Sequence, residues 1–336
     1  FGVFLQYFSW RLVFLTSLPI GLLAIRNSYP LLKYQFQQIA SEAKTIKIQY
    51  TGAVLMVATL GVFILSGLHI HDGAEAFTTP EALSYHVPMH LLFLAMLALF
   101  VVVQLRSSEP FVDFRYFKEK YFSTALFSNT TFHLSMLAVT TLIPIMVEDG
   151  LGQIPLMVTV VLFPNQFLGL FLPTLGGWIY DRYNPRFFRP ASLALIAGAF
   201  LMVGFFAGNV PFWVLPIMLL PAGIGFNLFS TANNAVVMNS LEESRTFASG
   251  MLETTRQMGH TIGTTISAAV LGLALPVAID VLPVFEAQAA YRQGFQYSAL
   301  VVVWIMAAGA FVAIFTKTSH GVSQTPSGEP APQPAG

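Results

Sequence analysis

The strongest constraint on the fold is the recurrence of apolar segments of about 20 residues, the length at which an α-helix crosses the hydrocarbon core of a bilayer. Hydrophobic residues make up 55% of the 336-residue chain and charged residues only 10%, whereas a soluble domain carries about 25% charged residues. The sequence therefore predicts an all-α, polytopic transmembrane helical bundle of about nine spans. The spans are expected at residues 10–26, 49–68, 86–105, 122–147, 156–179, 190–208, 212–238, 247–273 and 296–316.

The positions of the basic residues predict how these spans are oriented. If the nine spans alternate in direction, thirteen of the sixteen Lys and Arg residues fall in loops on one side of the membrane. Arg11 and Arg292 fall on the other side, and Arg256 lies within a span. Because loops rich in Lys and Arg face the cytoplasm, the loop at 26–48 and the C-terminus are expected to be cytoplasmic.

The chain is expected to divide into four regions. They are the end of an N-terminal bundle, a segment with a linker and two spans, a C-terminal six-helix bundle, and a disordered cytoplasmic tail rich in Pro, Ser, Gly and Gln. Their expected bounds are 1–26, 27–121, 122–316 and 317–336. The second region ends in a segment, 106–121, whose alternating aromatic and charged residues predict a short interfacial helix. Because the chain begins at Phe1, without a methionine, we expect a truncated N-terminal bundle.

Composition and motifs exclude several functional classes. The chain has no cysteine, which excludes disulfides and thiolate chemistry, and its formal net charge of zero gives no indication of nucleic acid as a partner. No catalytic motif is present, so we expect neither an enzyme nor a cofactor. His86 and His90 stand at a spacing that can bind a metal. A solvated loop is the favoured interpretation of the surrounding His and acidic residues, and no metal site is predicted.

The most informative motif lies at the cytoplasmic end of the span at 156–179. Gly177 would let a neighbouring helix approach closely. The Asp181 carboxylate could pair with a guanidinium or with a helix N-terminus, holding two helical bundles together in one state and releasing them in another. The candidate gating residues are Gly177, Asp181, Arg182 and Arg186. A plain basic loop is the alternative interpretation.

This complete pattern, G-x-x-x-D-R-x-x-x-R, resembles the loop motif of the major facilitator superfamily. Three other segments are similar to the fourteen-span drug:proton antiporter branch of that family: Gly2 to Gly21 with Trp10-Arg11 and Pro19, Pro110-x-x-Asp113-x-Arg115-x-Phe117, and Gly250 to Gly263 with Arg256-Gln257 and Gly259. Leu12 and Ser17 depart from the usual pattern of the first segment.

The resemblance covers residues 1–316 and implies a fold and a function. The chain would supply spans six to fourteen of a bacterial inner-membrane transporter, with 49–68 and 86–105 as two extra spans between the bundles. Two six-helix bundles would surround a central cavity and alternate its access to the two sides of the membrane. The family implies proton-coupled export, with important coupling and substrate residues in the missing N-terminal half.

Polar side chains within spans are costly and usually face the protein interior or a wet cavity. In the span at 247–273, Glu253, Arg256 and His260 share one helical face and are candidates for proton coupling. A structural ion pair between the first two, and a packing role for the histidine, are the alternatives. Gly259 and Gly263 form a G-x-x-x-G pattern that favours close helix packing.

Amide and imidazole side chains in other spans mark candidate cavity or substrate-binding residues. Interhelical hydrogen bonding or packing is the alternative for each. These candidates are Asn129, His133, Asn165, Gln166, Asn227 and Asn234.

The sequence therefore predicts a secondary active transporter that exports amphipathic or cationic small molecules by proton coupling. Its expected partners are the small-molecule substrate, protons, the lipid bilayer and the missing N-terminal bundle of the same chain. Two alternatives stay open. One is a transport-incompetent structural half or truncated fragment. The other, less favoured, is a polytopic membrane enzyme, for which His133 and His260 are the weak reactive candidates.

Overall fold

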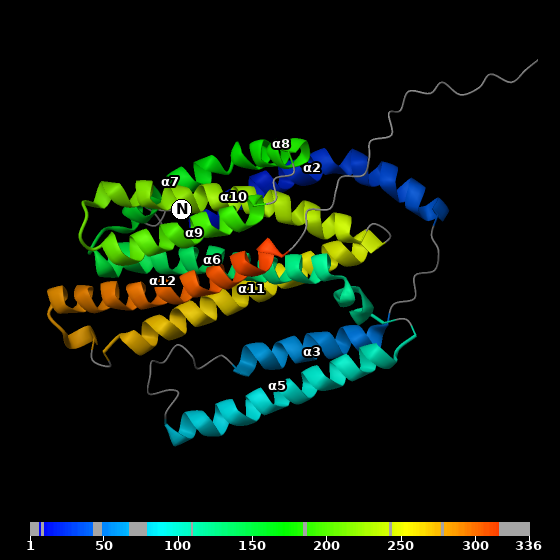
Figure 1. Ribbon diagram of the computed structural model, residues 1–336, viewed down its shortest axis with the longest axis horizontal. Coiled ribbons are helices and arrows are strands. Elements are labelled where there is room, and N and C mark those ends of the chain that lie inside the picture. Colours follow the sequence, from blue (N-terminus) through cyan, green and yellow to red (C-terminus); the bar gives the residue numbers. More distant parts are fainter. Residues whose placement is uncertain are drawn as a thin grey trace, which may run out of the picture.

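The computed structural model describes residues 7, 10–42, 49–66, 79–108, 110–183, 187–241, 244–276 and 279–315. Across these residues the regular structure is helical and contains no strand (Figure 1), which confirms the expected all-α class. The helices are α2 (Trp10–Glu42), α3 (Tyr50–Ser66), α5 (Pro80–Arg106), α6 (Lys120–Ile145), α7 (Pro155–Leu168), α8 (Leu172–Tyr183), α9 (Phe188–Phe206), α10 (Leu215–Ser240), α11 (Arg245–Ala274) and α12 (Val284–Ile314).

Within the described residues, six helical segments are long and apolar enough to cross a membrane. They are Pro80–Arg106, Lys120–Gly150, Pro155–Tyr183, Phe188–Phe206, Phe212–Ser240 and Val284–Ile314. The other three predicted spans are also helical. Of these, α3 is apolar but has only 17 residues, whereas α2 and α11 are long but less apolar, and α11 carries its charged side chains in its first half. The chain is therefore an integral membrane protein.

Three local features differ from the sequence-based expectation. The helix α2 runs to Glu42, well beyond the predicted span end at 26, although Pro30 lies within this extension. The predicted interfacial helix at 106–121 is reduced to a 3₁₀ turn, η2 (Phe114–Lys118), which the Asp113 side chain caps. The predicted span at 156–179 is divided into α7 and α8 by a turn before Pro173, whose missing N–H breaks the helical ladder. The predicted tail lies outside the described residues.

Helices α6 to α12 form the bundle that holds the core. Within it, α6 packs against α11 and α12, and α9 packs against α10 and α12. Buried aromatic and aliphatic side chains from these helices fill the centre. Among the largest are Phe122, Phe200, Phe229, Phe295, Ile196 and Met306.

The contact between α6 and α11, here called the α6–α11 seam, is built on two glycines of α11. A Cβ atom placed on Gly259 would lie 2.5 Å from the carbonyl oxygen of Thr130 and 2.9 Å from Cβ of His133. A Cβ atom on Gly263 would collide with the carbonyl oxygen of Leu134. The two backbones therefore approach to a distance that only glycine permits, as the G-x-x-x-G pattern predicts.

The helices α3 and α5 form a hairpin that lies beside the bundle (Figure 1). At one end of the hairpin, the Tyr85 hydroxyl donates to the carbonyl oxygen of Leu65 at 2.7 Å. At the other end, two glutamine side chains accept hydrogen bonds from the connecting loop: Gln49 from the N–H of Phe111 at 2.8 Å, and Gln104 from the N–H of Val112 at 3.0 Å. These bonds fix the loop that leads from the hairpin into the bundle.

We predict that Gly263→Ala destabilises the protein by about 1–3 kcal/mol, the usual cost of overpacking a tight contact. Thermal unfolding in detergent, followed by tryptophan fluorescence, measures the change. The matched control is Gly250→Ala in the same helix, where a Cβ atom meets nothing within 4 Å. The control should be neutral or should stabilise the helix by up to about 1 kcal/mol. Equal effects of the two substitutions would show that the seam does not depend on glycine.

The loop before α6 generates a pH prediction. The Asp113 carboxylate accepts hydrogen bonds from the backbone N–H and the guanidinium of Arg115, whose Nη2 lies 2.7 Å from Oδ2. These bonds lower the pKa of Asp113. The stabilising contribution of this carboxylate is therefore present above the ordinary Asp pKa of about 4 and is lost as the pH falls through the lowered value.

Accordingly, wild type should melt at a higher temperature than Asp113→Asn at neutral pH, and the two curves should converge in strongly acidic buffer. Adding Arg115→Gln to Asp113→Asn should cost little more than the single change, because both substitutions remove the same interaction. A melting-temperature gap that stays constant with pH would contradict the assignment.

Candidate functional site

The α6–α11 seam brings together two histidines that the sequence nominated separately. Nδ1 of His133, in the middle of α6, lies 3.2 Å from Nε2 of His260, in the middle of α11. The two rings meet edge to face, with centroids 5.0 Å apart. His133 is buried, with 6% of its surface exposed, whereas His260 is half-buried. One ring must donate and the other must accept in this contact, so at least one of the two facing nitrogens carries no proton.

Asn129 lies about one helical turn from His133 and fastens the same seam. Its Nδ2 donates to the carbonyl oxygen of Leu252 at 3.0 Å and to the Thr255 hydroxyl at 2.9 Å. The side chain is 1% exposed. In this conformation it joins two helices, which is the alternative that the sequence left open, and it does not line an open space.

Charged residues occupy an adjacent stripe of α11. Nη1 of Arg256 lies 3.1 Å from Oε2 of Glu253, and Nε2 of Gln257 donates to Oε1 of Glu253 at 2.7 Å. The Glu253 side chain is 53% exposed and that of Arg256 is 36% exposed. The expected i,i+3 pair is therefore present, on the surface of the bundle.

The polar stripe and the packing stripe of α11 are distinct. The buried positions recur every three or four residues and face the other helices of the bundle. They are Ala248, Leu252, Thr255, Gly259, Gly263, Ser267 and Leu271. The predicted polar face follows a 3.5-residue period and drifts around a helix of 3.6 residues per turn. It is consequently exposed at Glu253 and half-buried at His260, beside the buried stripe.

A second group of predicted residues meets between α7 and α10. A Cβ atom on Gly223 would collide with Oδ1 of Asn165, so the absence of a side chain at Gly223 makes room for this amide. Nδ2 of Asn227 donates to the carbonyl oxygen of Gly223 at 2.8 Å. Gln166 is exposed and Asn234 is half-buried. Oδ1 of Asn165 is buried without a hydrogen-bond partner among the described residues.

The structure describes three of the four candidate gating residues, and Arg186 lies outside the described part of the chain. Asp181 and Arg182 are exposed at the end of α8, with the Arg182 guanidinium 5.9 Å from the centres of the Trp178 and Tyr183 rings. Gly177 is half-buried near Thr231. The tighter approach to α10 is made by the preceding residue, Gly176, where a Cβ atom would lie 3.0 Å from Leu228.

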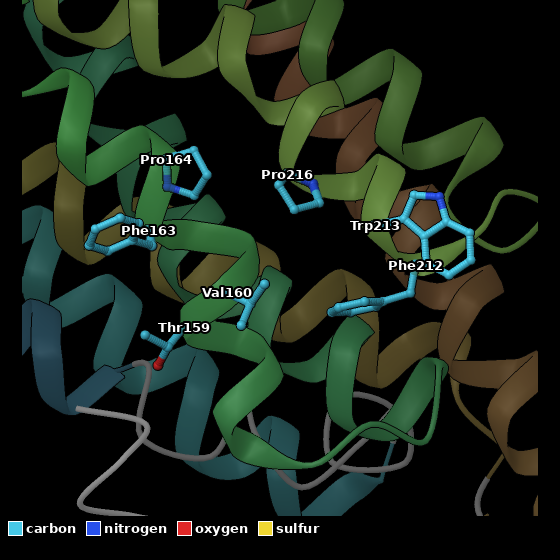
Figure 2. Close-up of a pocket in the computed structure, with 7 residues that line it drawn as sticks. All are labelled: Thr159, Val160, Phe163, Pro164, Phe212, Trp213 and Pro216. Carbon is cyan, nitrogen blue, oxygen red and sulfur yellow. The ribbon is translucent and has the colours of Figure 1, made fainter.

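An apolar pocket of about 540 Å³ lies between α7 and the start of α10. Figure 2 shows Phe163 and Pro164 on one side, and Phe212, Trp213 and Pro216 on the other. None of the predicted polar residues lines the pocket, but Pro164 precedes Asn165 directly. The pocket can accept the apolar part of a ligand, whereas the polar groups lie elsewhere in the bundle.

Several buried polar residues were not singled out from the sequence, among them Asn233, Thr255 and Arg189. Asn233 is fully buried and donates to the carbonyl oxygen of Ala125 at 3.3 Å, whereas its neighbour Asn234, the sequence candidate, is half-buried. Thr255 completes the Asn129 contact. Arg189, counted only as a loop base, is 4% exposed at the start of α9, near Tyr180. Helical periodicity was the available signal for the first two, since both fall on buried stripes.

We predict that Asn129→Ala destabilises the bundle by about 0.6–1.7 kcal/mol, from the average to the largest value measured for interhelical hydrogen bonds in a membrane protein. Thermal unfolding in detergent is the measurement. Thr254→Ala is the control, because the Thr254 hydroxyl bonds only to Gly250 of its own helix. If Thr254→Ala costs as much as Asn129→Ala, the Asn129 bond does not hold the seam.

Comparison with known proteins places this arrangement in a family. The chain resembles an uncharacterized MFS-type transporter, YhcA, of Bacillus subtilis (24% identity over 266 residues, 79% of this chain and 48% of that protein). It also resembles multidrug resistance protein 3 of the same organism (24%, covering 78% and 49%) and a methylenomycin A resistance protein of Streptomyces coelicolor (22%, covering 80% and 54%). The chain spans about half the length of these relatives. The sequence model of the Major Facilitator Superfamily matches residues 1–264, and the chain belongs to this superfamily.

Proposed function

We propose that this chain is the C-terminal part of a proton-coupled exporter of amphipathic or cationic small molecules. The observation that carries the proposal is the stripe of exposed Glu253 and Gln257 and half-buried Arg256 on α11, next to the His133–His260 pair. The names of several relatives, which include multidrug, methylenomycin A and lincomycin resistance proteins, support export as the direction of transport.

The polar stripe of α11 lies deep enough in the membrane to require a water-filled cavity beside it. With a rise of 1.5 Å per residue, Glu253 lies about 12 Å from the start of α11, and His260 lies about 22 Å from it. The apolar core of a bilayer is about 30 Å thick. Exposed charges at such depths cannot face lipid tails without a large cost. A water-filled cavity, closed on its other side by a second bundle, accommodates them.

The second bundle is part of the proposal, and so are the fourteen-span branch and the bacterial inner membrane with a cytoplasmic C-terminus. The length of the relatives, about twice the matched part of this chain, supports a second bundle. The α3–α5 hairpin is consistent with the two extra spans of that branch. Export would proceed by alternating access, with the exposed Asp181 and Arg182 available to contact the other bundle in one state.

The proposed roles of the residues follow from their positions. The histidine pair, with the Glu253–Arg256 ion pair beside it, takes up and releases the coupling proton. The amides Asn165 and Asn227 and the apolar pocket, which includes Pro164 next to Asn165, contribute to the binding of an amphipathic substrate. A compound with an apolar body and a polar head matches this combination of surfaces.

Efflux assays in everted membrane vesicles from cells that express the complete gene test the proposal. We predict that Asp181→Asn lowers the efflux rate of a lipophilic cation by about 10- to 150-fold, because a hydrogen bond to a charged group contributes about 1.5–3 kcal/mol. His133→Ala and His260→Ala should both make efflux less dependent on the proton gradient while substrate binding persists. His90→Ala, in the hairpin, is the matched histidine control and should behave as wild type.

If wild-type vesicles show no proton-dependent flux of any amphipathic compound, the proposed function is wrong. If only Asp181→Asn is impaired and both histidine variants keep full proton dependence, the gate is supported and the histidines are packing residues.

A further inference from the structure

We propose that the His133–His260 pair binds a single transition-metal ion of the kind that imidazole nitrogens prefer, such as Zn²⁺, Co²⁺ or Ni²⁺. The two ligand atoms are Nδ1 of His133 on α6 and Nε2 of His260 on α11. This inference goes beyond the proposed transport function and does not depend on it, because it rests on the geometry of the two rings alone.

The distance between the two nitrogens fits a metal ion. A zinc–imidazole bond is about 2.0–2.1 Å long, and two such bonds to nitrogens 3.2 Å apart enclose an angle of about 100°. This angle is close to that of tetrahedral coordination, the geometry that zinc adopts in proteins. An ion would therefore lie beside the line that joins the two nitrogens, and both rings would rotate to direct a lone pair at it.

The surrounding structure holds both rings in place while leaving one side of the pair accessible. Gly259, the residue before His260, packs against the backbone of Thr130 and against Cβ of His133, which fixes the register of the two helices. The ring of Phe132 contacts that of His133 edge to face, with centroids 4.7 Å apart. Because His260 is only half-buried, an ion and its waters can enter from that side.

The chain supplies two ligands, and water fills the remaining positions. Within the described residues, no group of three or more His, Asp or Glu side chains is placed to hold a metal. Common catalytic zinc sites have three protein ligands and one open position, whereas this site has two protein ligands. The proposed site is therefore an exchangeable one that takes up an ion from solution.

Metal binding fixes where the two rings carry their protons. In the metal-free pair one nitrogen donates and the other accepts, whereas the metal takes a lone pair from each of the two facing nitrogens. His133 must then carry its proton on Nε2 and His260 on Nδ1. A neutral pair makes this change without losing a proton, but a pair that holds an extra proton must release it. Binding therefore requires the neutral form of both imidazoles.

The charged groups nearest to the two histidines are on α11 itself. The helices packed against α11 carry no charged residue in their middle parts. No charged residue lies between Lys120 and Glu148 on the α6 side, within α10, or in α12 after Arg292. On α11, Arg256 repels a divalent cation, and the Glu253 carboxylate partly offsets this repulsion through the ion pair. Removing the guanidinium should therefore tighten metal binding.

The test is a titration of the purified protein in nanodiscs with Co²⁺, followed by its visible absorption, and with Zn²⁺, followed by calorimetry. Wild type should bind one ion. His133→Ala and His260→Ala should each weaken binding by about tenfold or more, since loss of a ligand costs at least as much as loss of an outer-shell partner. His90→Ala is the matched control, because Nδ1 of His90 bonds to its own helix, and it should bind as wild type.

Arg256→Gln keeps both rings and provides a second, independent variant. It should bind Co²⁺ several-fold more tightly than wild type, a gain that misfolding cannot produce. The proposal is overturned if wild type binds no ion, if the two alanine variants bind as well as wild type, if His90→Ala abolishes binding, or if Arg256→Gln leaves the affinity unchanged. None of these readouts involves transport, so the proposed function stands or falls separately.

Discussion

The close approach of α6 and α11 is the interaction on which the candidate site depends. Lipid tails are as apolar as leucine, so helices in a membrane associate through van der Waals packing and interhelical hydrogen bonds. Gly259 and Gly263 allow the two backbones to touch, and Asn129 adds hydrogen bonds across the contact. With the register fixed in this way, His133 meets His260. A larger residue at either glycine would separate the two imidazoles.

The helix α11 combines two tasks that most spans do not combine. One stripe packs into the bundle and is small or apolar at nearly every position, whereas the next stripe carries Glu253, Arg256 and Gln257 at the surface. This division explains why α11 falls short of the apolarity of a typical span although it lies within the bundle. Such a helix suits the boundary between a protein core and a water-filled space, which is the position that the proposed exporter requires.

Several site residues were predicted from the sequence because helical periodicity and the cost of polar groups in a membrane are local properties. Both histidines, the Glu253–Arg256 pair and the glycine pattern belong to this group. The sequence could not show which of two neighbouring residues is more buried. The fully buried amide is Asn233 and the more tightly packed glycine is Gly176, next to the candidates Asn234 and Gly177. A rotation of 100° per residue separates such neighbours, and only packing fixes that rotation.

The sequence by itself determined that this protein is an all-helical membrane protein and where most of its helices lie, because hydropathy over 20 residues is a property of composition alone. Its motifs also indicated the superfamily to which it belongs. The tertiary structure decided which polar groups meet. Asn129 and Thr255 join in the seam, the two histidines form a pair, and the charged stripe of α11 remains exposed. These contacts depend on how each helix is rotated against its neighbours, and that rotation is set by the fit of glycines and side chains on two helices at once.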